Sequence, residues 1–157
     1  MLDDPINVRL LKELQRDCRL SLAELGQRVG LSPSACHRRV QQLEEAGIIA
    51  GYGARLDARR LGYAMEFFVE VSLKSQSDKA LAAFERAVRA QPEILECHLM
   101  TGGSDYLLRI VARDSADFER IHRECLSGLP NVARLVSHLS IRTVRPWSGY
   151  PINGLVG

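Results

Sequence analysis

The segment from residue 21 to residue 53 constrains this chain most, because it carries two short helical patterns separated by a tight turn. Ser21 and Glu24 form an S-x-x-E capping box, in which each side chain satisfies an amide that the first helical turn leaves unpaired. Gly30 stands where this helix would end, since glycine adopts the left-handed conformation there without strain. Apolar side chains recur between these signals at the spacing of a helix face: Leu22, Leu25 and Val29.

A second helix is predicted directly after Leu31. Ser32 is a favourable N-cap, and Pro33 fits the first helical position, where its missing N–H costs nothing. One side of this helix is apolar or small: Cys36, Val40, Leu43 and Gly47. The other side carries hydrogen-bonding groups: Ser34, His37, Arg38 and Gln41. Two helices around a tight turn, the second with a polar outer side, form the pattern of a helix-turn-helix.

This pattern is typical of a DNA-reading unit, whose second helix enters the major groove and touches base edges near its N-terminus. Arg38 has the geometry for a bidentate bond to guanine, and Gln41 for one to adenine. Hydroxyls beside the helix N-terminus suit phosphate oxygens. The candidate DNA-contacting residues are Ser32, Ser34, His37, Arg38, Arg39 and Gln41. The alternative is a helical hairpin whose Arg and His side chains only keep one face hydrated.

Composition bounds the class of protein. A chain of 157 residues holds one large domain or two small ones, and 46% hydrophobic with 25% charged residues is ordinary for a globular protein. The net charge of +2 is weak evidence for nucleic acid, because DNA binding needs a basic patch rather than a basic total. Neither a membrane-spanning apolar run nor a signal peptide is visible, so we expect a cytoplasmic protein.

The four cysteines and four histidines are scattered along the chain. No C-x-x-C pair is present, and the histidine spacings do not match a metal site. We therefore expect neither a metal nor a cofactor, and reduced thiols that are mostly buried.

Organisation before the linker is predicted as a three-helix bundle spanning residues 1–50. Its first helix begins near Asp4-Pro5, ends near Asp17 and carries an apolar side: Val8, Leu10, Leu11 and Leu14. A short hairpin over residues 48–57 follows, and it overlaps a hinge strand or linker at residues 51–62. Three arginines in this region could follow a phosphate backbone or be solvated loop charges: Arg55, Arg59 and Arg60.

The second half, residues 63–145, alternates strand and helix patterns. Phe67, Val69, Val71 and Leu73 have the strand period, and later segments read as a helix, two strands, a helix and a last strand: 78–90, 94–101, 105–112, 115–129 and 132–144. This β-α-β-β-α-β order predicts an α+β chain with a ferredoxin-like (ACT-like) second domain. Helices cover one face of such a sheet, and the apolar members of the other face predict pairing with another copy.

A tail, residues 146–157, is rich in turn formers and is expected to lack regular structure. Trp147 and Tyr150 are large side chains there that would pack locally or against a neighbouring subunit.

Taken together, both halves resemble the Lrp/AsnC, or feast/famine, family of transcription regulators. The matching stretches run from Leu10 to about residue 144 and include LAELGQRVGLSPSACHRRVQQLEEAGIIAGYG, LGY, FFVEV, PEILECHLMTGGSDYLLRI and LPNVARLVSHLSI. The resemblance implies a winged helix-turn-helix, a hinge strand and an amino-acid-sensing domain. It also implies homodimers formed through the sheet that assemble into octamers or higher oligomers on double-stranded DNA.

The family binds small amino acids between dimers, near the turn that matches Thr101–Tyr106. A Gly-Gly turn suits this role physically, because successive N–H groups can point together at a carboxylate. The candidate effector-binding residues are Thr101, Gly102, Gly103, Ser104, Asp105, Tyr106, Ser137 and His138. Asp105 would pair with the ligand ammonium. The alternative is an ordinary hairpin turn in which Asp105 satisfies the turn amides.

The chain departs from the family pattern at three places. Asn7 stands where an acidic residue is usual in the first helix. Gly103 stands where the family commonly has Asp or Glu, so the effector could differ or be absent. Ser137-His138 replaces a common Thr-Ser, and a histidine in a ligand pocket would make binding depend on pH.

Three functions follow as hypotheses. The first is a DNA-binding transcription regulator tuned by an amino acid, and the second is an effector-independent architectural protein that wraps DNA. The third, an enzyme, is disfavoured: Cys36 and His37 are adjacent and diverge by roughly 100° on a helix, so they form no nucleophile–base pair. We expect no catalytic residues.

Overall fold

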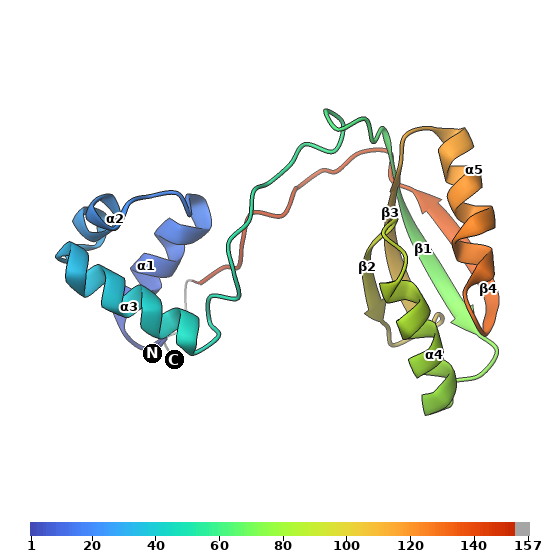
Figure 1. Cartoon of the computed structure of the whole chain (residues 1–157), viewed down its shortest axis with the longest axis horizontal. Helices are drawn as coiled ribbons and strands as arrows, with labels where there is room; N and C mark the ends of the chain where they lie inside the picture. Colours follow the sequence, from blue (N-terminus) through green and yellow to red (C-terminus); the bar gives the residue numbers. More distant parts are fainter. Residues whose placement is uncertain (153–157) are drawn as a thin grey trace. The chain divides into compact units, whose positions relative to one another are not determined.

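The computed structural model describes residues 1–152 and divides the chain into two compact units. The first unit, residues 1–55 together with residues 145–152, holds the N-terminal helices (Figure 1). The second unit, Leu56–Val144, holds the sheet. The chain therefore passes between the units twice. The sequence alone does not predict that the tail belongs to the first unit.

The first unit is the predicted three-helix bundle, with α1 at Pro5–Arg16, α2 at Leu22–Val29 and α3 at Pro33–Glu45 (Figure 1). Its core follows the predicted apolar stripes. One cluster consists of Leu10, Leu25, Val29 and Cys36, each at most 3% exposed. A second cluster consists of Leu11, Leu43 and Ile152. Burial of these side chains fixes α3 against the other two helices.

The predicted helix ends are confirmed by the caps. The Ser21–Glu24 capping box is complete in both directions, and Gly30 ends α2 in the left-handed conformation with φ of 78°. Ser32 caps α3 by accepting a hydrogen bond from the Ala35 N–H at 3.3 Å. Asp4 caps α1 in the same way through the Ile6 N–H at 2.8 Å. Local chemistry therefore sets where each helix begins.

The prediction that Gly47 lies on the inner side of α3 is wrong. Gly47 is exposed and follows the C-cap residue Ala46 with φ of 69°. The next amide, of Ile48, donates to the Leu43 carbonyl at 3.0 Å, and the Gly47 amide donates to the Glu44 carbonyl at 2.9 Å. This pair of bonds is a Schellman motif, so Gly47 ends the helix instead of packing beneath it.

The hairpin expected over residues 48–57 and the hinge strand are also absent from the described structure, since residues 46–64 contain no strand. A strand needs a neighbour to pair its alternate N–H and C=O groups. Within residues 1–152 no sheet edge takes up this segment, and the wing is not formed by the single chain.

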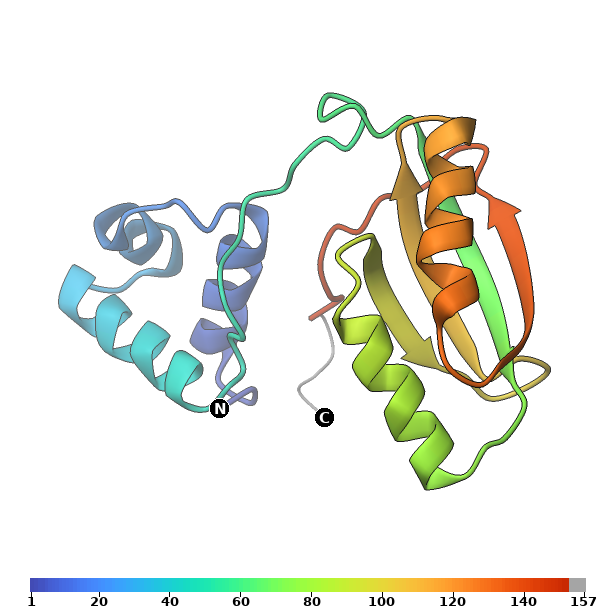
Figure 2. The ribbon, with the colours of Figure 1, turned by 45° about the vertical axis from the view of Figure 1, so that its right-hand side comes forward.

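The second unit has the predicted βαββαβ order. Its elements are β1 (Met65–Leu73), α4 (Asp78–Arg89), β2 (Ile94–Leu99), β3 (Tyr106–Ala112), α5 (Ser115–Glu124), a 3-10 turn (Leu126–Gly128) and β4 (Val132–Leu139). The antiparallel strands lie in the order β2-β3-β1-β4, and α4 and α5 cover one face (Figure 2). The predicted ferredoxin-like fold is confirmed.

Strand alternation separates the two faces of this sheet. The helix-covered face buries a core that includes Phe67, Val69, Val71, Leu108 and Ile110, packed against Phe84 and Ile121. The opposite face, which we call the open face, carries the alternate residues of the two central strands: Glu66, Phe68, Glu70, Leu107, Arg109 and Val111. It is half-buried at most of these positions without any covering layer among residues 1–152.

The last helix and the last strand are shorter than predicted. The helix expected to reach residue 129 ends at Glu124 and tightens into the 3-10 turn. The strand expected to reach residue 144 ends at Leu139. The Ser140 N–H donates to the Glu66 carbonyl at 2.8 Å, and because β1 begins at Met65, it has no further residues to pair with the chain beyond Ser140. Among residues 1–152 the longest helix, α3, has 13 residues, and none is long and apolar enough to cross a membrane.

Gly26 generates a test of the bundle. A Cβ on Gly26 would lie 2.6 Å from the backbone oxygen of Leu31, in the turn that positions α3. We expect Gly26→Ala to destabilise the bundle by roughly 1–3 kcal/mol, because backbone in a packed turn cannot yield cheaply. Thermal unfolding measures the change. Gly53→Ala is the control, since a Cβ there meets nothing within 4 Å; equal melting temperatures for the two variants would contradict the packing.

Candidate nucleic-acid interface and ligand site

The outer side of α3 presents the predicted polar residues to solvent. Five of the six candidates are exposed: Ser32, Ser34, His37, Arg38 and Gln41. Their positions follow from burial of Cys36 and Leu43 on the opposite side of the same helix. We call these five exposed side chains the reading row. The structure therefore brings them together on one helix face, as the sequence predicts.

The reading row is only lightly engaged in contacts of its own. The Ser32 and Ser34 hydroxyls lie 3.2 Å apart at the helix N-terminus. The Gln41 amide donates to a Glu45 carboxylate oxygen at 3.0 Å, one helical turn on. Among residues 1–152, neither His37 nor Arg38 forms a hydrogen bond or ion pair through its side chain. Both side chains are therefore available to an external acceptor.

Arg39, the sixth candidate, lies differently. Its guanidinium donates to a carboxylate oxygen of Asp4 and, at 2.9 Å, to the amide oxygen of Asn7, both from the start of α1. The side chain is only 25% exposed. Adjacent arginines on α3 thus have different environments: Arg38 faces solvent, whereas Arg39 ties α3 to α1.

Asn7, one of the three departures from the family pattern, is the buried acceptor for Arg39. It is 7% exposed, and its amide nitrogen also donates to the Met1 carbonyl at 3.0 Å. The Arg39 guanidinium, by hydrogen bonding, holds the pKa of the Asp4 carboxyl below its ordinary value. An amide at position 7 leaves Asp4 as the charged partner in this contact.

The predicted effector turn, residues 101–105, is exposed over its first three positions and joins β2 to β3. Gly102 has φ of 121°, which favours glycine, whereas Gly103 has an ordinary backbone conformation. A Cβ at either glycine would meet nothing within 4 Å. Within the described chain the amides of Gly102, Gly103 and Ser104 donate to no other residue. The turn therefore has free space beside both glycines, and its three amides have no hydrogen-bond acceptor in the described chain.

Asp105 is already occupied by the protein. One carboxylate oxygen accepts from the Leu73 N–H at 2.7 Å, and the other accepts from the Gln76 side-chain amide at 3.0 Å. Its own amide donates to the Val71 carbonyl at 2.9 Å. Asp105 thus fastens the end of β1 to the start of β3, and it does not satisfy the turn amides as the hairpin alternative required.

The remaining effector candidates do not converge on the turn within one chain. Tyr106 is 1% exposed, and burial with a hydrogen bond to Glu85 raises its pKa to about 12. Ser137 and His138 lie on the edge strand β4, opposite Val69 and Phe68 of β1, several residues from the end of β1 that meets the turn. His138 lies 3.4 Å from a Glu70 oxygen on the open face. A site joining all eight residues would need side chains from more than one copy.

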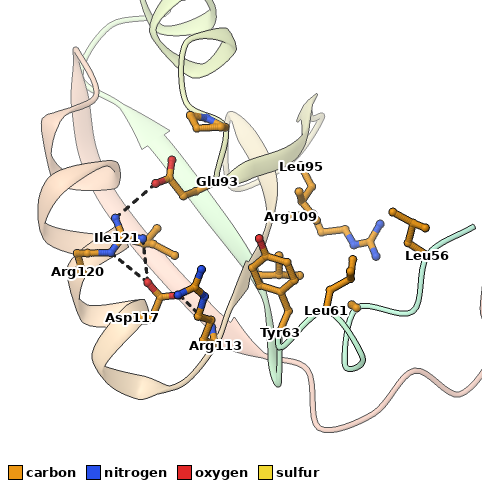
Figure 3. A pocket seen from close by; sticks show the side chains of 13 residues that line it. Leu56, Leu61, Tyr63, Glu93, Leu95, Arg109, Arg113, Asp117, Arg120 and Ile121 are labelled. Carbon is orange, nitrogen blue, oxygen red and sulfur yellow. Dashed lines mark hydrogen bonds and ion pairs between the residues drawn. The ribbon is translucent and has the colours of Figure 1, made fainter.

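A cavity of about 660 Å³ lies elsewhere in this unit (Figure 3). Apolar groups from the 56–63 segment and the sheet form part of its wall: Leu56, Leu61, Tyr63, Leu95 and Val111. Three of its charged groups are paired with one another, with Arg120 at 2.8 Å from Asp117 and 3.4 Å from Glu93 (Figure 3). The sequence patterns did not predict this cavity. The LGY stretch at residues 61–63 was a signal for it, because the apolar side chains of Leu61 and Tyr63 lie at the end of a segment expected to be a linker.

Arg109 crosses from this cavity to the open face. It contacts Glu66 at 2.7 Å and Glu96 at 2.6 Å. Its proximity lowers the pKa of Glu96. These two carboxylates neutralise the only arginine of the central strands of the sheet, so the open face carries paired rather than isolated charge at its centre.

Comparisons with known proteins agree with both units. The model of a winged helix-turn-helix DNA-binding family matches residues 3–50, and that of the Lrp/AsnC ligand binding domain matches residues 66–148. A Bkd operon transcriptional regulator of Pseudomonas aeruginosa is 41% identical over 149 residues, 95% of this chain and 97% of the relative. A leucine-responsive regulatory protein of Rhizobium meliloti is 43% identical over 90% of this chain and 91% of the relative.

Solved structures give the same result. A transcriptional regulator of Neisseria meningitidis, solved as an L-Met complex, superposes with a TM-score of 0.90 at 33% identity, covering 96% of this chain and 97% of that one. An AsnC family regulator from Agrobacterium tumefaciens has a TM-score of 0.91 at 30% identity, covering 97% and 99%.

A helix-turn-helix with an exposed reading row, joined to a ferredoxin-like domain, defines a transcriptional regulator with a ligand-binding domain. The extent and identity of the matches identify it further. The chain belongs to the Lrp/AsnC family of transcriptional regulators.

The contrast between Arg38 and Arg39 generates a test. We expect Arg39→Met to lower the melting temperature by several degrees, because the buried Asn7 oxygen and Asp4 lose their donor. The Asp4 pKa lies below its ordinary value of 3.8, so the ion pair stabilises the fold above that pH and is lost as pH falls through the lower folded pKa.

The difference between wild type and Arg39→Met should therefore stay constant from neutral pH down to about the ordinary Asp4 pKa of 3.8, and narrow as the pH falls below it and Asp4 becomes protonated. Thermal melts across that range measure it. Arg16→Met, whose side chain is 78% exposed on α1, is the control. A destabilisation that stays constant down to the lowest pH would show that the Asp4 contact contributes nothing.

Proposed function

We propose that this protein acts in the cytoplasm as a sequence-reading transcriptional regulator whose DNA affinity or assembly is modulated by a small amino acid. The observation that carries the DNA half is the reading row, in which His37 and Arg38 are exposed on a helix anchored from its opposite side. Arg38 would take a guanine edge and Gln41 an adenine edge. Gln41 would first have to leave Glu45, so its contribution is smaller than that of Arg38.

The proposed quaternary state is a homodimer formed through the open face, which assembles further into octamers or higher oligomers. Phe68 is 37% exposed there, and Leu107 and Val111 are partly uncovered neighbours. Pairing of Arg109 with two carboxylates reduces the charge that dimerisation would have to desolvate. A two-fold dimer would also present two reading rows to a palindromic operator.

The proposed effector site is the turn at residues 101–105, completed by side chains of a neighbouring dimer. Unengaged amides at Gly102, Gly103 and Ser104 suit the carboxylate of an amino acid. Because Asp105 is held by Leu73 and Gln76, it reaches the ligand ammonium only by giving up a bond. The L-Met complex of the Neisseria meningitidis relative supports an amino acid as the ligand class.

One observation favours an effector-independent alternative, the architectural DNA-wrapping protein. Gly103 brings no acidic group to the turn, and Asp105 is already engaged. Without an acidic partner the ammonium group of an amino acid has no counter-charge from this chain. Footprinting distinguishes the two: wrapping gives extended protection with a helical period, whereas regulated site binding gives a short protected site that changes with the effector.

Arg38→Ala tests the DNA half. On a duplex selected for tight binding, we expect a loss of roughly 1–3 kcal/mol, about 5- to 160-fold in Kd, together with relaxed preference at one base pair. Fluorescence anisotropy on selected and scrambled duplexes measures both. Arg86→Ala, which removes an exposed charge from α4, is the control. Equal weakening on every duplex would assign Arg38 to a phosphate instead.

Gly103 variants test the sensing half. Gly103 has open space and an ordinary backbone, so side chains can be added without backbone strain. Calorimetric titration of wild type with the common amino acids should reveal binding at or below millimolar concentration. We expect Gly103→Ala to weaken it and Gly103→Val to abolish it, with thermal stability and oligomer mass unchanged. If the wild-type protein binds none of the amino acids, effector sensing is contradicted. If Gly103→Val binds as tightly as wild type, the turn is not part of the binding site.

A further inference from the structure

The C-terminal tail docks on the DNA-binding bundle through its backbone. The Gln15 side chain of α1 forms two hydrogen bonds with Tyr150, donating to its carbonyl at 3.1 Å and accepting from its N–H at 2.7 Å. A side-chain amide that pairs with both polar groups of one residue mimics a strand partner and fixes the tail in register. The Tyr150 side chain is not needed for this contact, since it is 73% exposed.

Ile152 adds an apolar anchor two residues further on. It is 8% exposed and packs in one cluster with Leu11 of α1 and Leu43 of α3. Leu43 is fully buried and belongs to the helix that carries the reading row. A residue from the far end of the chain thus contributes to the packing that holds α3.

Gly149 makes this docking specific. It has φ of 101°, and a Cβ there would lie 2.6 Å from the Gln15 amide oxygen. Both the backbone conformation and the close approach favour glycine. The Trp147 and Tyr150 rings lie edge to face with centroids 4.8 Å apart, and both side chains stay largely exposed, at 64% and 73%.

The tail is also anchored where it leaves the sheet unit. The Ser140 N–H donates to the Glu66 carbonyl at 2.8 Å, directly after β4. Thr143 places its hydroxyl 3.5 Å from a Glu66 carboxylate oxygen, and the same carboxylate holds Arg109. The segment between the two anchors, including Ile141 and Val144, is highly exposed. It is therefore a span fixed at both ends rather than a loose terminus.

We propose that residues 145–152 form an intramolecular strap, whose docking on α1 and α3 completes the DNA-binding unit and gives the sensing domain a second connection to it, which is non-covalent at its docked end. The segment that covers this part of α1 and α3 is this chain's own tail. Because the chain passes between the units twice, a docked strap limits the conformations open to the reading row. Docking then raises DNA affinity, and this part rests on the proposed function.

The test uses the full-length protein and two readouts. Hydrogen exchange of the Tyr150 amide reports docking without any DNA, and anisotropy on a selected duplex reports affinity. Gln15→Ala removes both tail bonds while favouring the α1 helix, since alanine is the best helix former. Ile152→Ser removes the apolar anchor. Tyr150→Ala is the matched control, because it deletes an exposed side chain and keeps the backbone contacts.

We expect Gln15→Ala and Ile152→Ser to speed exchange at Tyr150 at least about tenfold, and to weaken DNA binding several-fold, with the Tyr150→Ala control close to wild type. Unchanged exchange in both variants would overturn docking. Faster exchange with unchanged DNA affinity would overturn the connection to DNA binding. If wild type shows a protected Tyr150 amide yet binds no duplex, the proposed function fails and the affinity claim fails with it, while docking remains visible.

Discussion

The packing of α3 by its inner side is the interaction on which the rest of this protein depends. Cys36 and Leu43 are both fully buried. Cys36 packs in a cluster with residues of α1 and α2, and Leu43 in a cluster with α1 and the tail. A helix of 13 residues is marginal alone, so its rigidity comes from this burial. Because the inner side is fixed, the outer side is fixed as well, and five polar side chains are held for an external partner.

The arginines of the bundle differ in whether a carboxylate pairs with them. Arg39 is held by Asp4 and Asn7, and Arg28 by Glu13 at 2.7 Å, so both stabilise contacts between helices. Arg38 faces outward with no such partner in the described chain. A like division occurs in the sheet unit, where Arg109 and Arg120 are neutralised by carboxylates. The paired arginines stabilise contacts within each unit, whereas the Arg38 guanidinium stays exposed on α3.

Sequence patterns predicted the elements well, because their signals are local. The Ser21–Glu24 box and the Ser32-Pro33 pair act within one helical turn, and strand alternation around Val69 needs only the strand itself. What sequence could not predict depends on distant partners. The role of Asn7 is set by Arg39, and that of Asp105 by Leu73 and Gln76. Docking of Ile152 on Leu11 spans almost the whole chain. No periodicity encodes such contacts.

The predicted effector site also depends on contacts that a single sequence does not encode. Eight residues were predicted for one site, and within a single chain they separate into an open turn, a buried tyrosine and an edge strand. The open turn remains the part whose geometry suits a ligand, while the cavity bounded by Leu61 and Arg109 lies apart from it.

Chemical modification of His37 in the presence of DNA tests the central claim most directly. Diethyl pyrocarbonate labels accessible imidazoles, and mass spectrometry reads each histidine separately. With a selected duplex bound, His37 should become protected, while His122 on α5, in the other unit, keeps its reactivity. Equal labelling of His37 with and without bound DNA would show that the outer side of α3 does not meet the duplex.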